Sequence, residues 1–178
     1  MSCPLECEYL QESRRHEKSG IEDPEQLPDR DVDVSEEFLQ SREELLAAMA
    51  EALGETALHT EGAVDFDVRE ALAALIRTYR TLAAGIHYET RPENRIAARL
   101  YDDLQDCIQE FRRQETELLG MPKTRDNDVL RLLVFFHHFA LDRNNGRKRG
   151  RAFIDALLDL YPDHPDEAPE AASPFILP

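Results

Sequence analysis

The sequence predicts an all-α protein: a bundle of about five mostly antiparallel helices, with a central apolar helix at about 126–144 and disordered acidic termini. Three observations lead to this prediction. The chain of 178 residues is 42% hydrophobic, which is enough for one buried core. It has only seven glycines and no tryptophan, while alanine, leucine, glutamate and arginine are abundant, a composition that favours helices. Apolar residues recur at spacings of three and four through the middle of the chain, as they do on one face of a helix.

Charge divides the chain into three parts. The formal net charge is -16, but residues 1–40 carry 4 Lys/Arg against 12 Asp/Glu, and residues 162–178 carry 4 acids and no Lys or Arg. Segments rich in acids and prolines cannot bury enough apolar surface to offset the entropy lost on ordering. We therefore predict an acidic, mostly disordered N-terminal segment at 1–34, a helical bundle domain at 35–161 and an acidic, proline-rich C-terminal tail at 162–178.

The first helix of the bundle is predicted to start after a capping serine. Either Ser35 caps it, or Ser41 does, with Glu44 completing a capping box three residues later. Gly54 is the predicted stop, because glycine is common just beyond the end of a helix. A second helix is predicted at about 67–84, where apolar residues alternate at spacings of three and four.

The third helix has the clearest local start signal in the chain, Thr90-Arg91-Pro92-Glu93. Thr90 is expected to cap this helix, with Pro92 in its first turn and Glu93 completing the capping box. Gly120 is the expected stop, since a glycine tolerates the left-handed conformation that often ends a helix.

The fourth helix, at about 126–144, is the most apolar part of the chain. Between Val129 and Leu141 only one arginine and two histidines interrupt the apolar residues. A helix that is apolar on nearly all sides is normally buried by several neighbours, so we expect it at the centre of the bundle. The alternative is that one face of 129–141 forms a homodimer. A fifth helix is predicted at about 147–160.

A cluster of cations at the turn between the last two helices is the main candidate site, and its members are Arg143, Arg147, Lys148, Arg149 and Arg151. Arg143 suits the C-terminal end of the fourth helix. The others crowd the predicted start of the fifth helix, where the helix dipole disfavours each cation by about 0.3–1 kcal/mol. Free backbone N–H groups and arginine side chains together form a receptor for an anion. The alternative is that these cations pair with acids of the same chain, and we expect the acidic ends to compete with an anionic partner for 143–151.

A second candidate site lies in the tail, where Phe175, Ile176 and Leu177 follow an acidic, proline-rich stretch. Apolar anchors on such a segment commonly dock into a groove of a partner protein. The alternative is that they fold back onto their own bundle.

The sequence indicates no cofactor. His138 and Asp142 are the best metal-ligand candidates, because residues four apart share a face of a helix. The repeated Glu-x-x-His pairs of helical di-metal sites are absent, however, so we predict no metal site. No nucleophile elbow or phosphate-binding loop is present either.

These observations favour a non-enzymatic interaction or regulatory protein that binds a protein partner through the basic turn, the tails or both. The alternatives are anion or nucleic-acid binding through 143–151 and, third, a metal-dependent helical enzyme. No apolar run approaches the length of a membrane span, so no membrane partner is expected. A charged segment instead of an apolar signal after Met1, together with only three cysteines, favours the cytoplasm.

Overall fold

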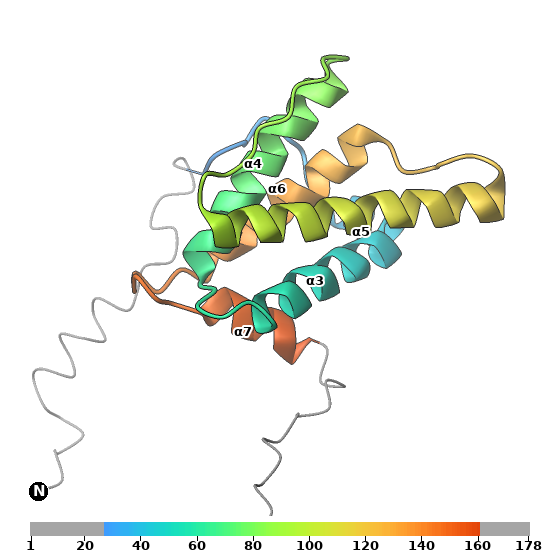
Figure 1. Ribbon diagram of the computed structural model, residues 1–178. Coiled ribbons are helices and arrows are strands. Elements are labelled where there is room, and N and C mark those ends of the chain that lie inside the picture. Colours follow the sequence, from blue (N-terminus) through green and yellow to red (C-terminus); the bar gives the residue numbers. More distant parts are fainter. Residues whose placement is uncertain (1–26, 161–178) are drawn as a thin grey trace, which may run out of the picture.

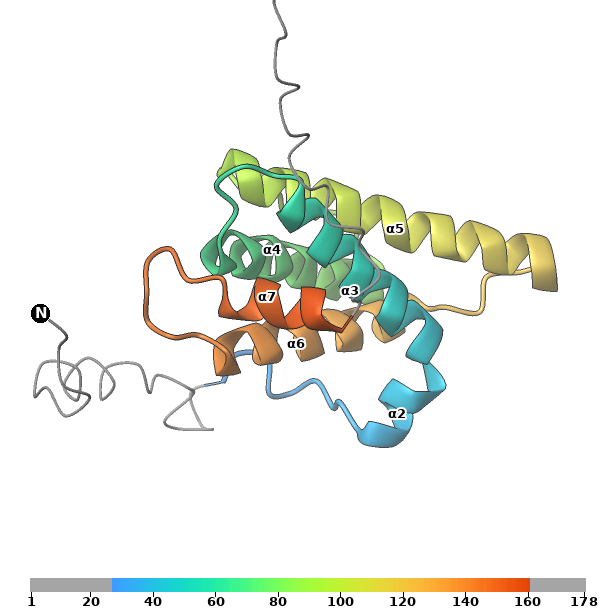
Figure 2. The same ribbon diagram turned by 90° about the horizontal axis from the view of Figure 1, so that it is seen from below.

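The computed structural model describes residues 27–160, which form six helices and no strand (Figure 1). Neighbouring helices run mostly antiparallel (Figures 1 and 2), so the predicted fold class is confirmed. None of the described helices is both long and apolar enough to cross a membrane. The helices are α2 (Glu36–Ser41), α3 (Glu43–Leu58), α4 (Asp65–Ala83), α5 (Arg95–Leu119), α6 (Asp126–Asp142) and α7 (Ala152–Asp159).

The core is centred on α4 and α6, which pack against each other more extensively than any other pair of described helices. α4 also contacts α5 and α7, and α3 lies between α5 and α7. The apolar run of α6 is therefore largely buried in the core of its own chain, although Phe135 and Phe139 are only partly buried. The buried residues of α6 are Val129, Leu130, Leu132, Leu133, Val134, Phe136, His137 and Ala140.

The predicted first helix is divided in two at Arg42. As predicted, Ser35 caps α2, its hydroxyl accepting a hydrogen bond from the Phe38 N–H at 3.3 Å. Ser41 caps nothing, because its hydroxyl donates back to the Phe38 carbonyl at 2.7 Å. At Arg42 the backbone leaves the helical region (φ -123°, ψ 22°), and the guanidinium pairs with Asp128 of α6 at 2.9 Å. The break thus lies at a tertiary ion pair.

The predicted end of the first helix and the predicted start of the third helix were both wrong. Gly54 lies inside α3, where an added Cβ would be 3.4 Å from Leu158, so the missing side chain lets α7 approach α3 closely. Thr90 does not cap α5, because its N–H donates to the hydroxyl of Thr78 on α4 at 2.9 Å. Asn94 caps α5 instead, and its side chain accepts from the helix backbone at 3.0 Å.

Part of the acidic N-terminal segment lies against the bundle. Residues 27–34 cross α4 and α6, and the carboxylates of this stretch pair with arginines of those helices rather than with the cations of 143–151. The ion pairs of this stretch are Arg80 with Asp29 and Asp31, both at 2.7 Å, and Arg131 with Asp33 at 3.1 Å. The other residues of the predicted acidic ends lie outside the described residues.

His137 is a buried titratable group of α6. It is 9% exposed, and its Nδ1 has no hydrogen-bond partner in the part of the chain that the structure describes. Burial lowers the pKa of His137 from 6.5 to about 4; Asp29 opposes this shift, whereas His138, Arg69 and Arg77 add to it. The imidazole is therefore neutral at pH 7.

We predict that His137 makes the protein less stable in mild acid. The unfolded chain protonates this imidazole near pH 6.5, whereas the folded protein resists protonation down to about pH 4. The unfolded state then binds more protons, so the free energy of unfolding falls as the pH drops through this window, by on the order of 3 kcal/mol in total. His137→Gln stays neutral and should lack this component. Urea unfolding of both proteins across the window measures it, and equal pH slopes would contradict the prediction.

Candidate functional site: the basic loop between α6 and α7

The predicted cation cluster lies in the loop between α6 and α7, which we call the basic loop (residues 143–151). The prediction that the fifth helix starts near Arg147 was wrong, because α7 begins at Ala152. The cations at 147–149 therefore precede the helix and are not placed in its first turn against the dipole. Only Arg151 lies at the helix start, as the N-cap residue.

The shape of the basic loop comes from its own hydrogen bonds. The side chain of Asn145 accepts from the N–H of Arg147 at 3.1 Å, and the N–H of Gly150 donates to the carbonyl of Arg147 at 3.0 Å. Gly146 has a φ of 70°, which side chains rarely allow. A Cβ at Gly150 would lie 2.5 Å from Asn145 Oδ1, so a larger residue would force this turn to move. Residues 147–149 lie in these turns, and all three are exposed.

Asp65, the first residue of α4, anchors the C-terminal end of the basic loop. Its side chain caps α7 from outside, accepting from the N–H groups of Phe153 at 3.2 Å and Ile154 at 3.1 Å, whereas Arg151 provides no side-chain cap. The Asp65 N–H also donates to the carbonyl of Gly150 at 2.9 Å. Asp65 is 2% exposed, and this burial raises its pKa above the usual range while the two hydrogen bonds lower it. A buried carboxylate thus fixes where α7 starts.

The first and last cations of the basic loop contact other parts of the bundle. Arg143 lies over the ring of Phe139, 5.1 Å from its centroid. Arg151 donates to the carbonyl of Ala63 at 2.9 Å, and its guanidinium is 3.8 Å from the carboxylate of Asp155. Arg143 and Arg151 therefore help to hold the basic loop on the bundle.

The cations between them are directed to solvent. Arg147, Lys148 and Arg149 are all exposed. Lys148 and Arg149 have no ion pair or hydrogen bond with any other described residue. Many other arginines differ in this respect, since they pair with nearby carboxylates. Examples are Arg91 with Asp102, Arg99 with Asp103, and Arg113 with Glu110.

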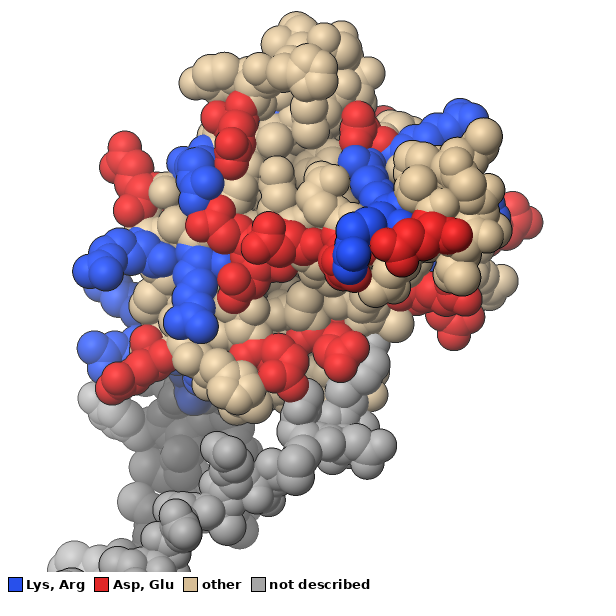
Figure 3. All heavy atoms as spheres, turned by 45° about the vertical axis from the view of Figure 1, so that its right-hand side comes forward, with Lys and Arg blue, Asp and Glu red and all other residues tan. Residues whose placement is uncertain are grey.

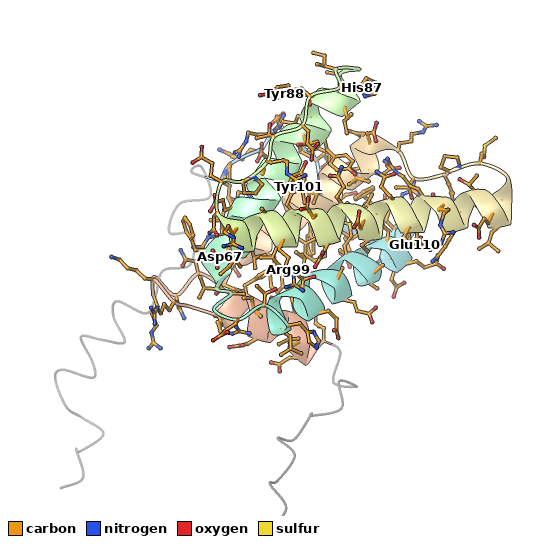
Figure 4. The ribbon with its side chains drawn as sticks, viewed as in Figure 1. Asp67, His87, Tyr88, Arg99, Tyr101 and Glu110 are labelled. Atoms are coloured by element: carbon orange, nitrogen blue, oxygen red, sulfur yellow. The ribbon has the colours of Figure 1, made fainter. Side chains whose placement is uncertain are left out.

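The N-termini of three helices meet at this end of the bundle. The Asp65 contacts join α4 to α7, and the side-chain amide of Asn94 at the start of α5 donates to Asp67 of α4 at 2.5 Å. Figure 4 shows Asp67 and Arg99 at this end, far from His87 and Tyr88 beyond the other end of α4. In Figure 3 lysine and arginine side chains gather at the left edge of the molecule, while acids run across the middle. Helix dipoles add positive potential at such N-termini.

The remaining predicted sites are not assembled by the described residues. His138 Nε2 lies 2.6 Å from the carbonyl of Pro28, and residues 27–160 contain no group of three or more His, Cys, Asp or Glu that could hold a metal ion, so no third ligand joins His138 and Asp142. The tail anchors lie outside the described residues; these are Phe175, Ile176 and Leu177.

Sequence reasoning missed Asp65, which lies two residues before the predicted start of the second helix at about 67. Its signal was weak: an acid directly after Val64 is typical of a first helical turn. Asp65 also caps α7 by binding Phe153 and Ile154, which follow it by 88 and 89 residues in the chain. A contact over such a distance leaves no pattern in the neighbouring sequence.

Comparison with protein-family models, curated proteins and solved structures found no match to this chain.

We predict that Asp65→Ala destabilises α7 and the basic loop. The substitution leaves the N–H groups of Phe153 and Ile154 without their acceptor, at a cost of about 1–3 kcal/mol. Urea unfolding measures the loss, and amide hydrogen exchange should become faster at these two positions. Glu61→Ala is the control, because Glu61 is an exposed acid in the loop before α4. Unchanged exchange at Phe153 and Ile154 would show that Asp65 does not hold the helix start.

Proposed function

We propose that this protein is a cytoplasmic, non-enzymatic interaction or regulatory protein, and that its basic loop binds an acidic segment of a partner protein. The observation that carries the proposal is the exposure of Lys148 and Arg149 without a partner among the described residues. In a chain of net charge -16, acids that could neutralise these cations are abundant. Because no acid of residues 27–160 pairs with these two cations, they can bind an external anion.

The shape of the basic loop supports the same proposal. Hydrogen bonds of Asn145 and Gly150 define its turns, and Asp65 and Arg151 tie its end to α4 and to the carbonyl of Ala63. A loop that is already ordered loses less conformational entropy when it binds. The cations at 147–149 are thus presented in a preorganised form.

An acidic protein segment suits this loop better than nucleic acid does. Nucleic-acid binders neutralise several phosphates along an extended basic surface. Here the cations at 147–149 form one short run, and acids lie across the neighbouring surface in Figure 3. The net negative charge also repels a long polyanion, whereas a short acidic segment can approach the loop locally.

We predict that Lys148→Glu/Arg149→Glu weakens binding of a fluorescent polyglutamate peptide about tenfold or more at low salt, because two attractive charges become repulsive. Fluorescence anisotropy of the labelled peptide measures the affinity. Raising the salt concentration should weaken binding to the wild type, since exposed charges are screened.

Lys123→Glu/Arg125→Glu is the matched control. It makes the same change in net charge in the exposed loop before α6, at the opposite end of the bundle in Figure 1. If both double variants lose the peptide equally, binding reflects overall charge and the proposal fails. A wild type that binds a short DNA duplex more tightly than polyglutamate would favour the nucleic-acid alternative instead.

A further inference from the structure

An apolar groove lies between α3, α6 and α7. Its volume is about 320 Å³, at the lower end of the range of small-molecule pockets. Glu43 is its sole charged lining residue among those described. The other lining residues are Leu46, Ala47, Ala50, Phe135, Phe136, Phe139, Leu157 and Leu160. This composition suits one or two uncharged, apolar side chains.

The groove is open because α7 is short. α7 has 8 residues, whereas α3 has 16 and α6 has 17. Figure 2 shows α7 ending part of the way along the other two helices. Leu160, directly after α7, lines the groove and is 62% exposed. None of the described residues therefore covers the groove beyond Leu160, the last residue that the structure describes.

We propose that the segment of Phe175, Ile176 and Leu177 of the same chain docks on this groove, with one or two of its side chains inside it. They are three consecutive large apolar residues, and the stretch between them and Leu160 contains 4 acids and several prolines. The proposal concerns a surface apart from the basic loop and does not depend on the proposed function.

The length of the intervening chain permits this docking. Residues 161–174 separate Leu160 from Phe175. A random coil of this length would have a root-mean-square span of roughly 20 Å, so the number of residues suffices for a return to a groove that starts beside Leu160. A short tether of this kind gives an effective concentration on the order of millimolar, which favours the attached segment over a free one.

The charge pattern also fits. Residues 171–174 are Ala-Ala-Ser-Pro, so no acid of the tail lies within four residues of Phe175. The side chains that enter the groove beside Glu43 would then carry no charge, whereas an acidic peptide would place a carboxylate side chain there. Partners with apolar anchors would have to displace the tail before they could bind here.

A single tryptophan can test this docking, because the natural chain contains none. In full-length Phe175→Trp, the emission should be shifted to shorter wavelength relative to the urea-unfolded protein and should be protected from acrylamide quenching. Adding Leu46→Glu, which places a charge in the groove, should restore the emission and quenching of exposed tryptophan. An exposed tryptophan in the Phe175→Trp protein itself would overturn the proposal.

Leu118→Glu is the matched control. Leu118 is 84% exposed and lines a different cavity, of about 500 Å³, near the end of α5. The control should leave the tryptophan emission unchanged, and a change there instead of with Leu46→Glu would place the tail in the other cavity. Emission that returns to the exposed value on dilution would show that the tail of a second copy fills the groove. Either result overturns docking within the chain.

Disulfide trapping keeps the test decisive if Leu46→Glu fails to fold. In a chain with Cys3, Cys7 and Cys107 changed to alanine, Leu46→Cys and Ile176→Cys should form an intramolecular disulfide under mild oxidation. The pair of Leu118→Cys with Ile176→Cys should form it at least tenfold more slowly. Equal rates for the two pairs would overturn the proposal.

Discussion

The position of α7 depends on one buried carboxylate, that of Asp65. A helix of 8 residues is too short to be stable alone, because nucleation costs more than so few hydrogen bonds return. Asp65 satisfies two of its free N–H groups, and Gly54 lets α3 approach it closely. The end of the basic loop and one wall of the apolar groove both follow from this placement.

Long-range contacts of this kind explain which parts of the fold could be predicted from the sequence. The periodic apolar residues of α4 and α6 report burial directly, so both helices lie where the sequence placed them. The start of α7 could not be predicted, because a residue of α4 determines it and Gly150 permits the turn before it. Thr90 failed as a cap for the same kind of reason: Thr78, on another helix, binds its backbone.

The candidate site was predictable in composition but not in geometry. Five cations in nine residues are plain in the sequence. Only the structure separates Arg143 and Arg151, which contact the bundle, from Lys148 and Arg149, which pair with no described residue. Residues 27–34 carry three carboxylates that pair with Arg80 and Arg131 on α4 and α6. Which arginines these carboxylates pair with depends on how the helices pack, and the order of residues along the chain does not show that packing.

The two candidate surfaces lie at opposite ends of α7, and this makes their formation interdependent. The N-terminal end of the helix carries the basic loop and is held by the charged cap from Asp65. The C-terminal end borders the groove and is held by apolar contacts such as those of Leu157. α7 has 8 residues, which span only about 12 Å, or little more than two turns. If one end of the helix unwinds, the other end therefore loses most of its helical hydrogen bonds as well. Local unfolding of α7 would therefore remove both surfaces together, and a ligand that stabilises one end also favours the formed state of the other.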